Sequence, residues 1–266
     1  MKRVLVAVLL GAAAVGAQSP SPGQAAYEKA NALFSAQRFQ ECMNALDDAL
    51  RLDPKLVPAL TLKAKLAMAI KRYDVARESL ERALAADPKS AYAQFLYGFH
   101  FYEQNQMPAA ITALEKARQL NPRDARAALY LGLARESQGD TQRALALYSE
   151  AIRLEQAAGK PQTSTLLTSF RLHFVLGEFD EAASLIDRAL KLEPASRDAH
   201  FQSARLRMKK GEPAAAAGEG EAALKLPAGD ATDRQIRFLL VQAYRTLGKD
   251  ADAARHAAAI RQADDK

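Results

Sequence analysis

The chain has 266 residues, of which 49% are hydrophobic, 7% aromatic and 26% charged, and it has no Trp. The strong helix formers Ala, Leu, Arg, Glu, Lys and Gln predominate, whereas β-branched residues are scarce after the first fifteen positions. This composition disfavours a fold built on β-sheet and predicts an all-α protein. The formal charge of +6 comes from basic residues spread among Asp and Glu without a block of like charges, a distribution that argues against nucleic-acid binding.

Residues 1–17 have the pattern of a secretory signal peptide. Lys2 and Arg3 precede an apolar run from Val4 to Val15, and the small residues that follow predict cleavage before Gln18. Twelve apolar residues are too few to span a bilayer, although an uncleaved N-terminal helix is an alternative. Removal of the two basic residues leaves 35 basic against 31 acidic side chains. The pattern predicts an exported protein, periplasmic or secreted, with no stable membrane span after cleavage.

The segment 18–24 is rich in Ser, Pro and Gly, and it predicts a disordered lead-in to the folded part. Cys42 is the only cysteine, so the chain has no internal disulfide and its fold depends on packing. An intermolecular bridge through this thiol is one interpretation. The other, which its position among alanines favours, is a small buried core residue.

A repeat of 34 residues follows along the chain. Asp53-Pro54, Asp87-Pro88 and Asn121-Pro122 are each separated by 34 positions, and each follows a run that begins with Ala. An insertion at 157–162 then shifts the frame by four residues, after which the same pattern ends at Pro194. A proline at the end of each run predicts a helix that stops there, because proline cannot continue the hydrogen-bond ladder.

Two further landmarks keep the same period. A small residue stands seven positions before the alanine that begins each run, and it predicts a close helix crossing. The series is Cys42, Ala76, Ala110, Ala144, Ala182 and Ala216, with Ala253 in the last unit. A second series marks turns between paired helices, at Gln37, Lys71, Asn105, Gly139, Gly177, Gly211 and Gly248. Gly98 and Gly132 supply small residues inside first helices.

With several units in register, the chain from about Gly23 to Ile260 resembles the tetratricopeptide repeat family. The resemblance implies a right-handed superhelical solenoid of about seven helix-turn-helix units that is stable only by stacking. Units one to four would occupy 25–156, and units five to seven 163–266, with the last unit as a cap that frays. Gly218 and Gly220 fall inside the second helix of unit six, where each is expected to cost about 1 kcal/mol relative to Ala.

The resemblance also implies a binding groove lined by the first helix of each unit. The groove residues so assigned are Tyr27, Asn31, Phe34, Lys65, Tyr92, Phe95, Phe99, Tyr102, Arg126, Arg171, Phe174, Phe201, Arg205 and Phe238. Nine of the 18 aromatic residues are in this set, interleaved with Arg and Lys, and such residues form hot spots in interfaces. They predict a groove for a segment with apolar side chains and a carboxylate. The competing interpretation is that the large residues serve packing and the arginines are solvated.

Some members of the family hold a peptide C-terminus with a clamp of Lys, Asn and Arg. Asn31 fits one clamp position, but Tyr27 replaces the expected Lys and Leu62 the next Asn. A receptor of that kind is therefore not supported.

The sequence offers no catalytic, metal or cofactor site. His100, His173, His200 and His256 are far apart, without a second ligand at the spacing of HExxH. GxSxG, P-loop and CxxC motifs are absent. We therefore expect no enzyme and no cofactor.

These observations predict an exported adaptor or scaffold that binds a protein or peptide segment in its concave groove. The alternative is a structural subunit of an envelope assembly that binds through its convex face or the ends of the array. Both rest on the fold, which does not by itself determine partners.

Overall fold

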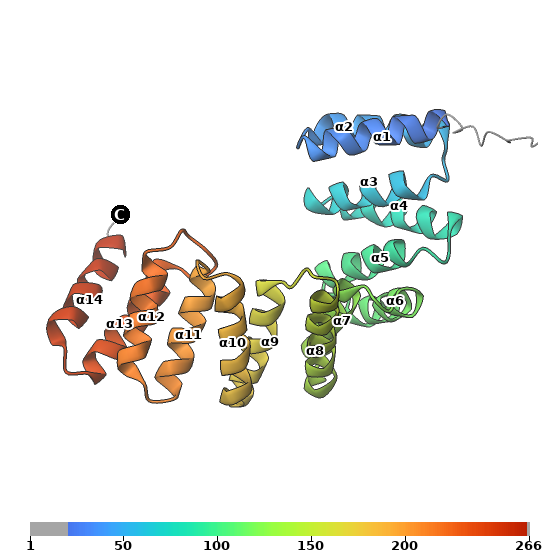
Figure 1. The fold of residues 1–266 in the computed structure, drawn as a ribbon. Helices are drawn as coiled ribbons and strands as arrows, with labels where there is room; N and C mark the ends of the chain where they lie inside the picture. Colours follow the sequence, from blue (N-terminus) through green and yellow to red (C-terminus); the bar gives the residue numbers. More distant parts are fainter. Residues whose placement is uncertain (1–20, 265–266) are drawn as a thin grey trace, which may run out of the picture. The chain divides into compact units, whose positions relative to one another are not determined.

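The computed structural model describes residues 21–264, which form fourteen α-helices and no strand (Figure 1). The all-α prediction is confirmed. The predicted signal peptide lies outside the described residues. Within them, no helix combines the length and the apolar character that crossing a membrane requires.

The chain divides into two compact units, residues 1–88 and 89–266. The first unit contains α1 (Pro22–Ser35), α2 (Phe39–Leu52), α3 (Val57–Ala69) and α4 (Tyr73–Ala86). The second contains α5 (Ala91–Glu103), α6 (Met107–Leu120), α7 (Ala125–Ser137), α8 (Thr141–Ala157), α9 (Thr163–Leu176), α10 (Phe179–Leu192), α11 (Arg197–Lys209), α12 (Pro213–Leu224), α13 (Asp233–Thr246) and α14 (Asp250–Asp264).

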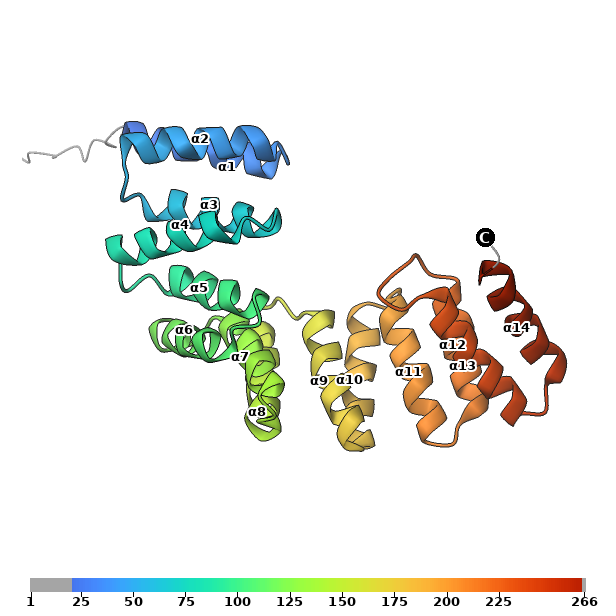
Figure 2. The same cartoon turned by 180° about the vertical axis from the view of Figure 1, so that it is seen from behind.

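Consecutive helices pair as hairpins, from α1 with α2 to α13 with α14, and Figure 2 shows these pairs from behind. In the second unit, the second helix of a hairpin packs on the first helix of the next, as α6 does on α7 and α10 on α11. First helices of neighbouring hairpins also touch, α5 with α7, α9 with α11 and α11 with α13. The odd-numbered helices are called first helices below.

The core is built on the small residues that the repeat predicts. Cys42, Ala76, Ala110, Ala144, Ala182 and Ala216 are all completely buried, and Ala253 is 4% exposed. Burial also raises the pKa of the Cys42 thiol. The interpretation of Cys42 as a core residue is therefore confirmed. Side chains of this size let paired helices approach closely enough for their larger neighbours to interdigitate.

The predicted turn positions adopt the left-handed conformation. Gly139, Gly177, Gly211 and Gly248 have φ between +69° and +79°. Gln37, Lys71 and Asn105 hold the same conformation at +58° to +60°, where a side chain costs strain that glycine avoids. Each residue lets the chain leave a first helix and enter the second within two or three residues.

The start of α1 differs from the sequence prediction. The lead-in was predicted to be disordered through Gln24, but α1 begins at Pro22. The Ser21 side chain accepts a hydrogen bond from the Gln24 backbone N–H at 3.2 Å, and proline is suited to the first helical position. Residues 22–24 are therefore helical because Ser21 caps the helix and Pro22 suits its first position.

The insertion after α8 is anchored through one carboxylate. Glu155 accepts hydrogen bonds from the Gln162 backbone N–H at 3.2 Å and from the Thr165 hydroxyl at 2.7 Å. Burial raises the pKa of this carboxyl group. The extra residues thus leave the fold of α9 intact, because Glu155 ties the end of α8 to the beginning of α9.

The long loop between α12 and α13 is held by two adjacent residues of α11. The buried Arg197 side chain donates to the carbonyl oxygens of Ala231 at 2.8 Å and Leu226 at 3.1 Å, and pairs with Asp233. Asp198 accepts from the backbone N–H groups of Ala231 at 2.7 Å and Asp230 at 3.2 Å. The loop is consequently fixed against the start of α11.

The two glycines of α12 have opposite surroundings. A Cβ atom at Gly220 would lie 2.8 Å from Cδ2 of the buried Leu240, whereas at Gly218 it would meet nothing within 4 Å. Gly220 therefore allows α12 to pack closely on α13, a role that Gly218 does not have.

We predict opposite effects of alanine at these positions. Gly218→Ala should raise the free energy of unfolding by about 1 kcal/mol, because alanine loses less backbone entropy in an exposed helix. Gly220→Ala should lower it by about 1–3 kcal/mol through overpacking against Leu240. Urea unfolding followed by circular dichroism measures both. A gain in stability for both variants would show that α12 and α13 do not pack as described.

Candidate functional site

All fourteen side chains predicted to line the groove are carried by first helices, and the two units are described in turn. In the first unit, Lys65 of α3 places its ammonium group 4.7 Å from the ring centre of Phe34 on α1. The same ring lies 5.9 Å from that of Phe39. Tyr27 is half-buried and Asn31 exposed, and neither takes part in this contact. An apolar hollow of about 290 Å³ lies beside the pair.

The second unit gathers five aromatic rings on α5 and α7. Phe95 lies 6.3 Å from both Tyr92 and Phe99, in stacked orientation. Tyr130 of α7 meets Phe99 at 4.9 Å and Tyr102 at 5.6 Å, with the rings edge to face. Rings in these arrangements attract beyond their hydrophobic contact. Tyr130 is not among the groove residues that the sequence predicts.

The rings of this cluster are exposed to different extents. Phe95 is only 6% exposed and packs 5.9 Å from Tyr130, so it mainly holds α5 against α7. Tyr92 is 36% exposed, and Phe99 and Tyr102 are half-buried. The surface available to a partner is therefore formed by Tyr92, Phe99 and Tyr102 rather than by Phe95.

Arg126 lies over two rings of the same cluster. Its guanidinium carbon is 4.9 Å from the ring centre of Phe95 and 5.2 Å from that of Tyr92. Two hydrogen bonds to Asp124, of 2.9 and 2.7 Å, neutralise its charge and raise the pKa of Arg126. The arginine thus contributes a planar surface and little net charge.

Arg171 of α9 is paired across the insertion. It donates to both carboxylate oxygens of Glu136 on α7 at 2.7 Å. Glu136 also accepts a hydrogen bond of 2.6 Å from the hydroxyl of the fully buried Tyr148. Burial, followed by this contact, raises the pKa of Tyr148 well above its ordinary value. Glu136 therefore links three helices, and Arg171 serves structure as well as surface.

Arg205 of α11 has the most unusual surroundings of the predicted cations. Its guanidinium carbon lies 4.8 Å from the ring of Phe174 on α9 and 5.9 Å from that of Phe201. Phe174 is itself stacked 5.6 Å from Phe170. Among the described residues, no carboxylate lies within 4.0 Å of Arg205, and burial lowers the pKa of Arg205. The last predicted residue, Phe238 of α13, is 48% exposed beneath Arg234.

The histidines are used locally. His100 is buried beside Gln104, and His256 lies 2.9 Å from Glu221. His173 and His200 each contact a glutamate at 2.6 Å, Glu178 and Glu219 respectively. Within residues 21–264 no three metal-ligating side chains come together. Each histidine is buried in the packing or makes polar contacts with neighbouring residues.

We predict that the Glu136 contact stabilises the second unit. Tyr148→Phe removes the buried hydroxyl that donates to Glu136 and should lower the free energy of unfolding by about 1–2 kcal/mol. Denaturant unfolding is the measurement. Glu103→Ala, at an exposed position on α5, is the control and should change stability by less than about 0.5 kcal/mol. Equal effects of the two changes would contradict the role of Glu136.

Comparison with known families identifies the repeat. The tetratricopeptide repeat model matches residues 61–117, 100–161 and 167–231, which together make up more than half of the chain. A second model, described as anaphase-promoting complex, cyclosome, subunit 3, matches residues 6–83. None of the curated proteins matches this sequence.

Solved structures share the fold. A structure from the functional characterisation of Pseudomonas aeruginosa pilF is 20% identical, with a TM-score of 0.67, and the match covers 89% of this chain and 97% of that one. The Cut9–Hcn1 hetero-tetramer of the APC/C gives 17% identity and a TM-score of 0.70 over 85% of this chain, but only 44% of that one. The MamA protein is 25% identical over 65% of this chain and 93% of its own, with a TM-score of 0.53.

Proposed function

The chain belongs to the tetratricopeptide repeat family, and we propose that it is an exported adaptor that binds a segment of a partner protein on its first helices. Members of this family generally mediate protein–protein interactions. Binding of a segment on the first helices is proposed from the side chains that these helices carry.

One recurring contact carries the proposal. Three times, a cation of one first helix lies on an aromatic ring of the preceding first helix: Lys65 on Phe34, Arg126 on Tyr92 and Phe95, and Arg205 on Phe174. A fourth pair, Arg234 on Phe238, lies within α13. Each contact keeps a large ring and a planar or long cation in a fixed arrangement at the surface.

This arrangement suits binding. Aromatic and arginine side chains contribute most of the energy of protein interfaces. Cation–π contact holds both groups in place before a partner arrives, so less side-chain entropy is lost on association. A partner segment with apolar side chains would cover the exposed part of Tyr92 and Phe99, and its hydrogen-bonding groups would meet the cations.

A pull-down from cell-envelope extract tests the α5–α7 surface. We predict that the chain from Gln18 onward recovers a partner and that the double variant Tyr92→Ala/Phe99→Ala weakens binding by more than about tenfold, as for an interface hot spot. Phe95 is left unchanged, because its buried ring supports the fold.

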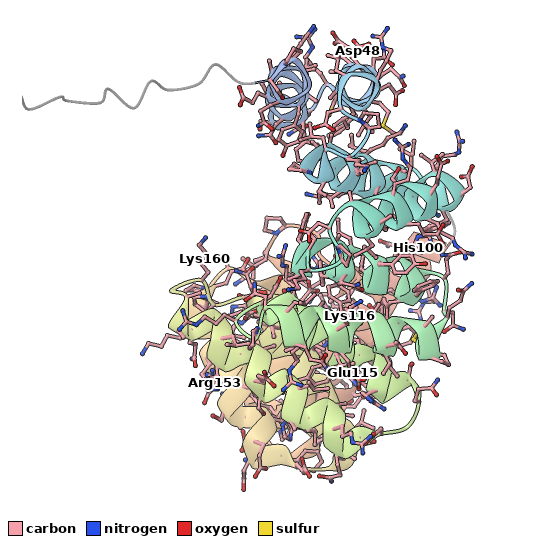
Figure 3. The ribbon with its side chains drawn as sticks, turned by 90° about the vertical axis from the view of Figure 1, so that its right-hand side faces the viewer. Asp48, His100, Glu115, Lys116, Arg153 and Lys160 are labelled. Carbon is pink, nitrogen blue, oxygen red and sulfur yellow. The ribbon has the colours of Figure 1, made fainter. Side chains whose placement is uncertain are left out.

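A matched control places two changes away from the first helices. Arg153 on α8 and Lys160 in the following loop are exposed, and both are labelled in Figure 3. Arg153→Ala/Lys160→Ala should retain the partner, while circular dichroism shows that both double variants are folded. Retention by Tyr92→Ala/Phe99→Ala would overturn the proposal and favour the alternative, an assembly subunit that binds through second helices or array ends.

Export is proposed from the signal pattern of residues 1–17. When the full chain is expressed in a Gram-negative host, mass spectrometry of the periplasmic fraction should find a protein that begins at Gln18. Replacement of Leu9 and Leu10 by Asp should keep the full-length chain in the cytoplasm, because the apolar run is what export requires. A full-length wild-type chain in the cytoplasm would contradict this proposal.

A further inference from the structure

A hollow of about 580 Å³ lies in the second unit, between α9, α11 and the start of α13. Its volume is in the range of sites that hold small ligands or a few residues of a peptide. Because α9 and α11 are both first helices, they run in the same direction, so the C-termini of both lie toward one end of the hollow and the N-termini toward the other. The two ends of the hollow differ in charge.

The end toward the helix C-termini is cationic. Arg205 and Arg171 line it, and Glu136 already neutralises Arg171. Arg205 has a single described hydrogen-bond acceptor, the side-chain oxygen of Gln202 at 2.7 Å from Nη1. Among the described residues, Arg205 forms no ion pair with a carboxylate.

Arg205 differs from Arg126, Arg171 and Arg197 of the same unit, because each of those three pairs with a carboxylate. Arg126 pairs with Asp124, Arg171 with Glu136, and the buried Arg197 with Asp233. Arg205 is removed from water by two aromatic rings, which lowers its pKa, yet it gains no opposite charge in return. A half-buried guanidinium in this state favours an external anion, and a carboxylate matches its two parallel N–H donors.

The end toward the helix N-termini is anionic. Glu193, Asp198 and Asp230 line it, and no Lys or Arg does. Asp198 is held by two backbone N–H groups of the loop. Glu193 and Asp230 are exposed, and neither forms an ion pair among the described residues. This end would repel a carboxylate and attract a cation.

The separation of the two ends sets the spacing of the ligand charges. Arg205 follows Asp198 by seven residues on α11, which corresponds to about 10 Å along a helix axis. A polyproline II segment has three residues per turn and rises about 3.1 Å per residue, so side chains three residues apart lie on one face about 9 Å apart. We propose that the hollow binds a peptide segment in the polyproline II conformation, with an acidic side chain at Arg205 and a basic side chain three residues away at Asp198, Asp230 and Glu193. This inference rests on the proposed function, because it specifies the partner of the same first helices.

Two synthetic hexapeptides are suitable probes, blocked at both ends: Ala-Glu-Pro-Pro-Lys-Ala and its reversed order, Ala-Lys-Pro-Pro-Glu-Ala. Proline favours the polyproline II conformation, and the two orders cover both chain directions. Isothermal titration of the chain from Gln18 onward should detect one of them. Replacement of Glu by Gln in that peptide should weaken binding by about tenfold to a hundredfold, as expected for a charge-assisted hydrogen bond. Absence of binding by both peptides at millimolar concentration overturns the proposal.

Protein variants assign each end. Arg205→Met keeps an apolar chain between the rings and should bind the Glu and Gln peptides equally. The wild-type chain should prefer the peptide with Lys to one in which Gln replaces Lys. The Glu193→Gln/Asp230→Asn variant should bind these two peptides equally, while it still prefers Glu to Gln at the acidic position. Arg245→Met is the matched control, because Arg245 is exposed on α13 and lies outside the hollow. It should behave as wild type.

Charge reversal provides a test by gain of binding. Arg205→Glu should prefer a peptide with Lys at both charged positions over the original probe. If Arg205→Met retains the Glu preference, or Arg205→Glu gains none for the second Lys, the assignment of Arg205 is wrong. A partner that depends on Tyr92 and Phe99 in the pull-down, together with no binding of either peptide, would overturn this inference alone. If Tyr92→Ala/Phe99→Ala still recovers the partner and Arg205→Met still prefers the Glu peptide, both the proposed function and this inference are wrong.

Discussion

The close approach of paired helices at small side chains is the constraint on which the rest of the structure depends. Without a disulfide and with few aromatic residues, the hairpins are held by contacts that require small residues at each crossing. A methyl group at Gly98 would lie 2.6 Å from Leu114, and one at Gly132 2.7 Å from Tyr148. The same crossings fix how far apart successive first helices lie. They thereby set the distance at which a cation of one helix reaches the ring of the preceding one.

Much of this architecture could be predicted from the sequence because the repeat reports the same physical requirement several times. The buried series from Cys42 to Ala253 and the left-handed turns from Gln37 to Gly248 both fall where the period places them. A position that must be small, or must adopt positive φ, restricts the residue type strongly. Gly220 shows the limit of this reasoning: its role depends on Leu240, a neighbour from another helix that the pattern of α12 does not contain.

The candidate site could be predicted as a set of residues but not as a set of contacts. The resemblance to the repeat family assigns fourteen side chains that all lie on first helices, yet it does not separate the buried Phe95 from the exposed Tyr92. Tyr130 completes the aromatic cluster, although the resemblance does not assign it to the groove. The partners of the arginines could not be predicted either, because their sequence separation varies. Asp124 is two residues from Arg126, whereas Glu136 is 35 residues from Arg171. Such pairings depend on side-chain rotamers and on distances between helices.

The charges on the first helices are more easily explained by binding than by stability. Exposed ion pairs contribute about 0–1 kcal/mol, and a cation on an aromatic ring about 0.5–1 kcal/mol at an exposed site. Arg205 gains the second of these but loses hydration without a carboxylate in return. An apolar side chain between Phe174 and Phe201 would stabilise the unit without that loss. The unmatched cation at one end of the hollow and the unmatched carboxylates at the other are both accounted for when a ligand supplies the missing charges.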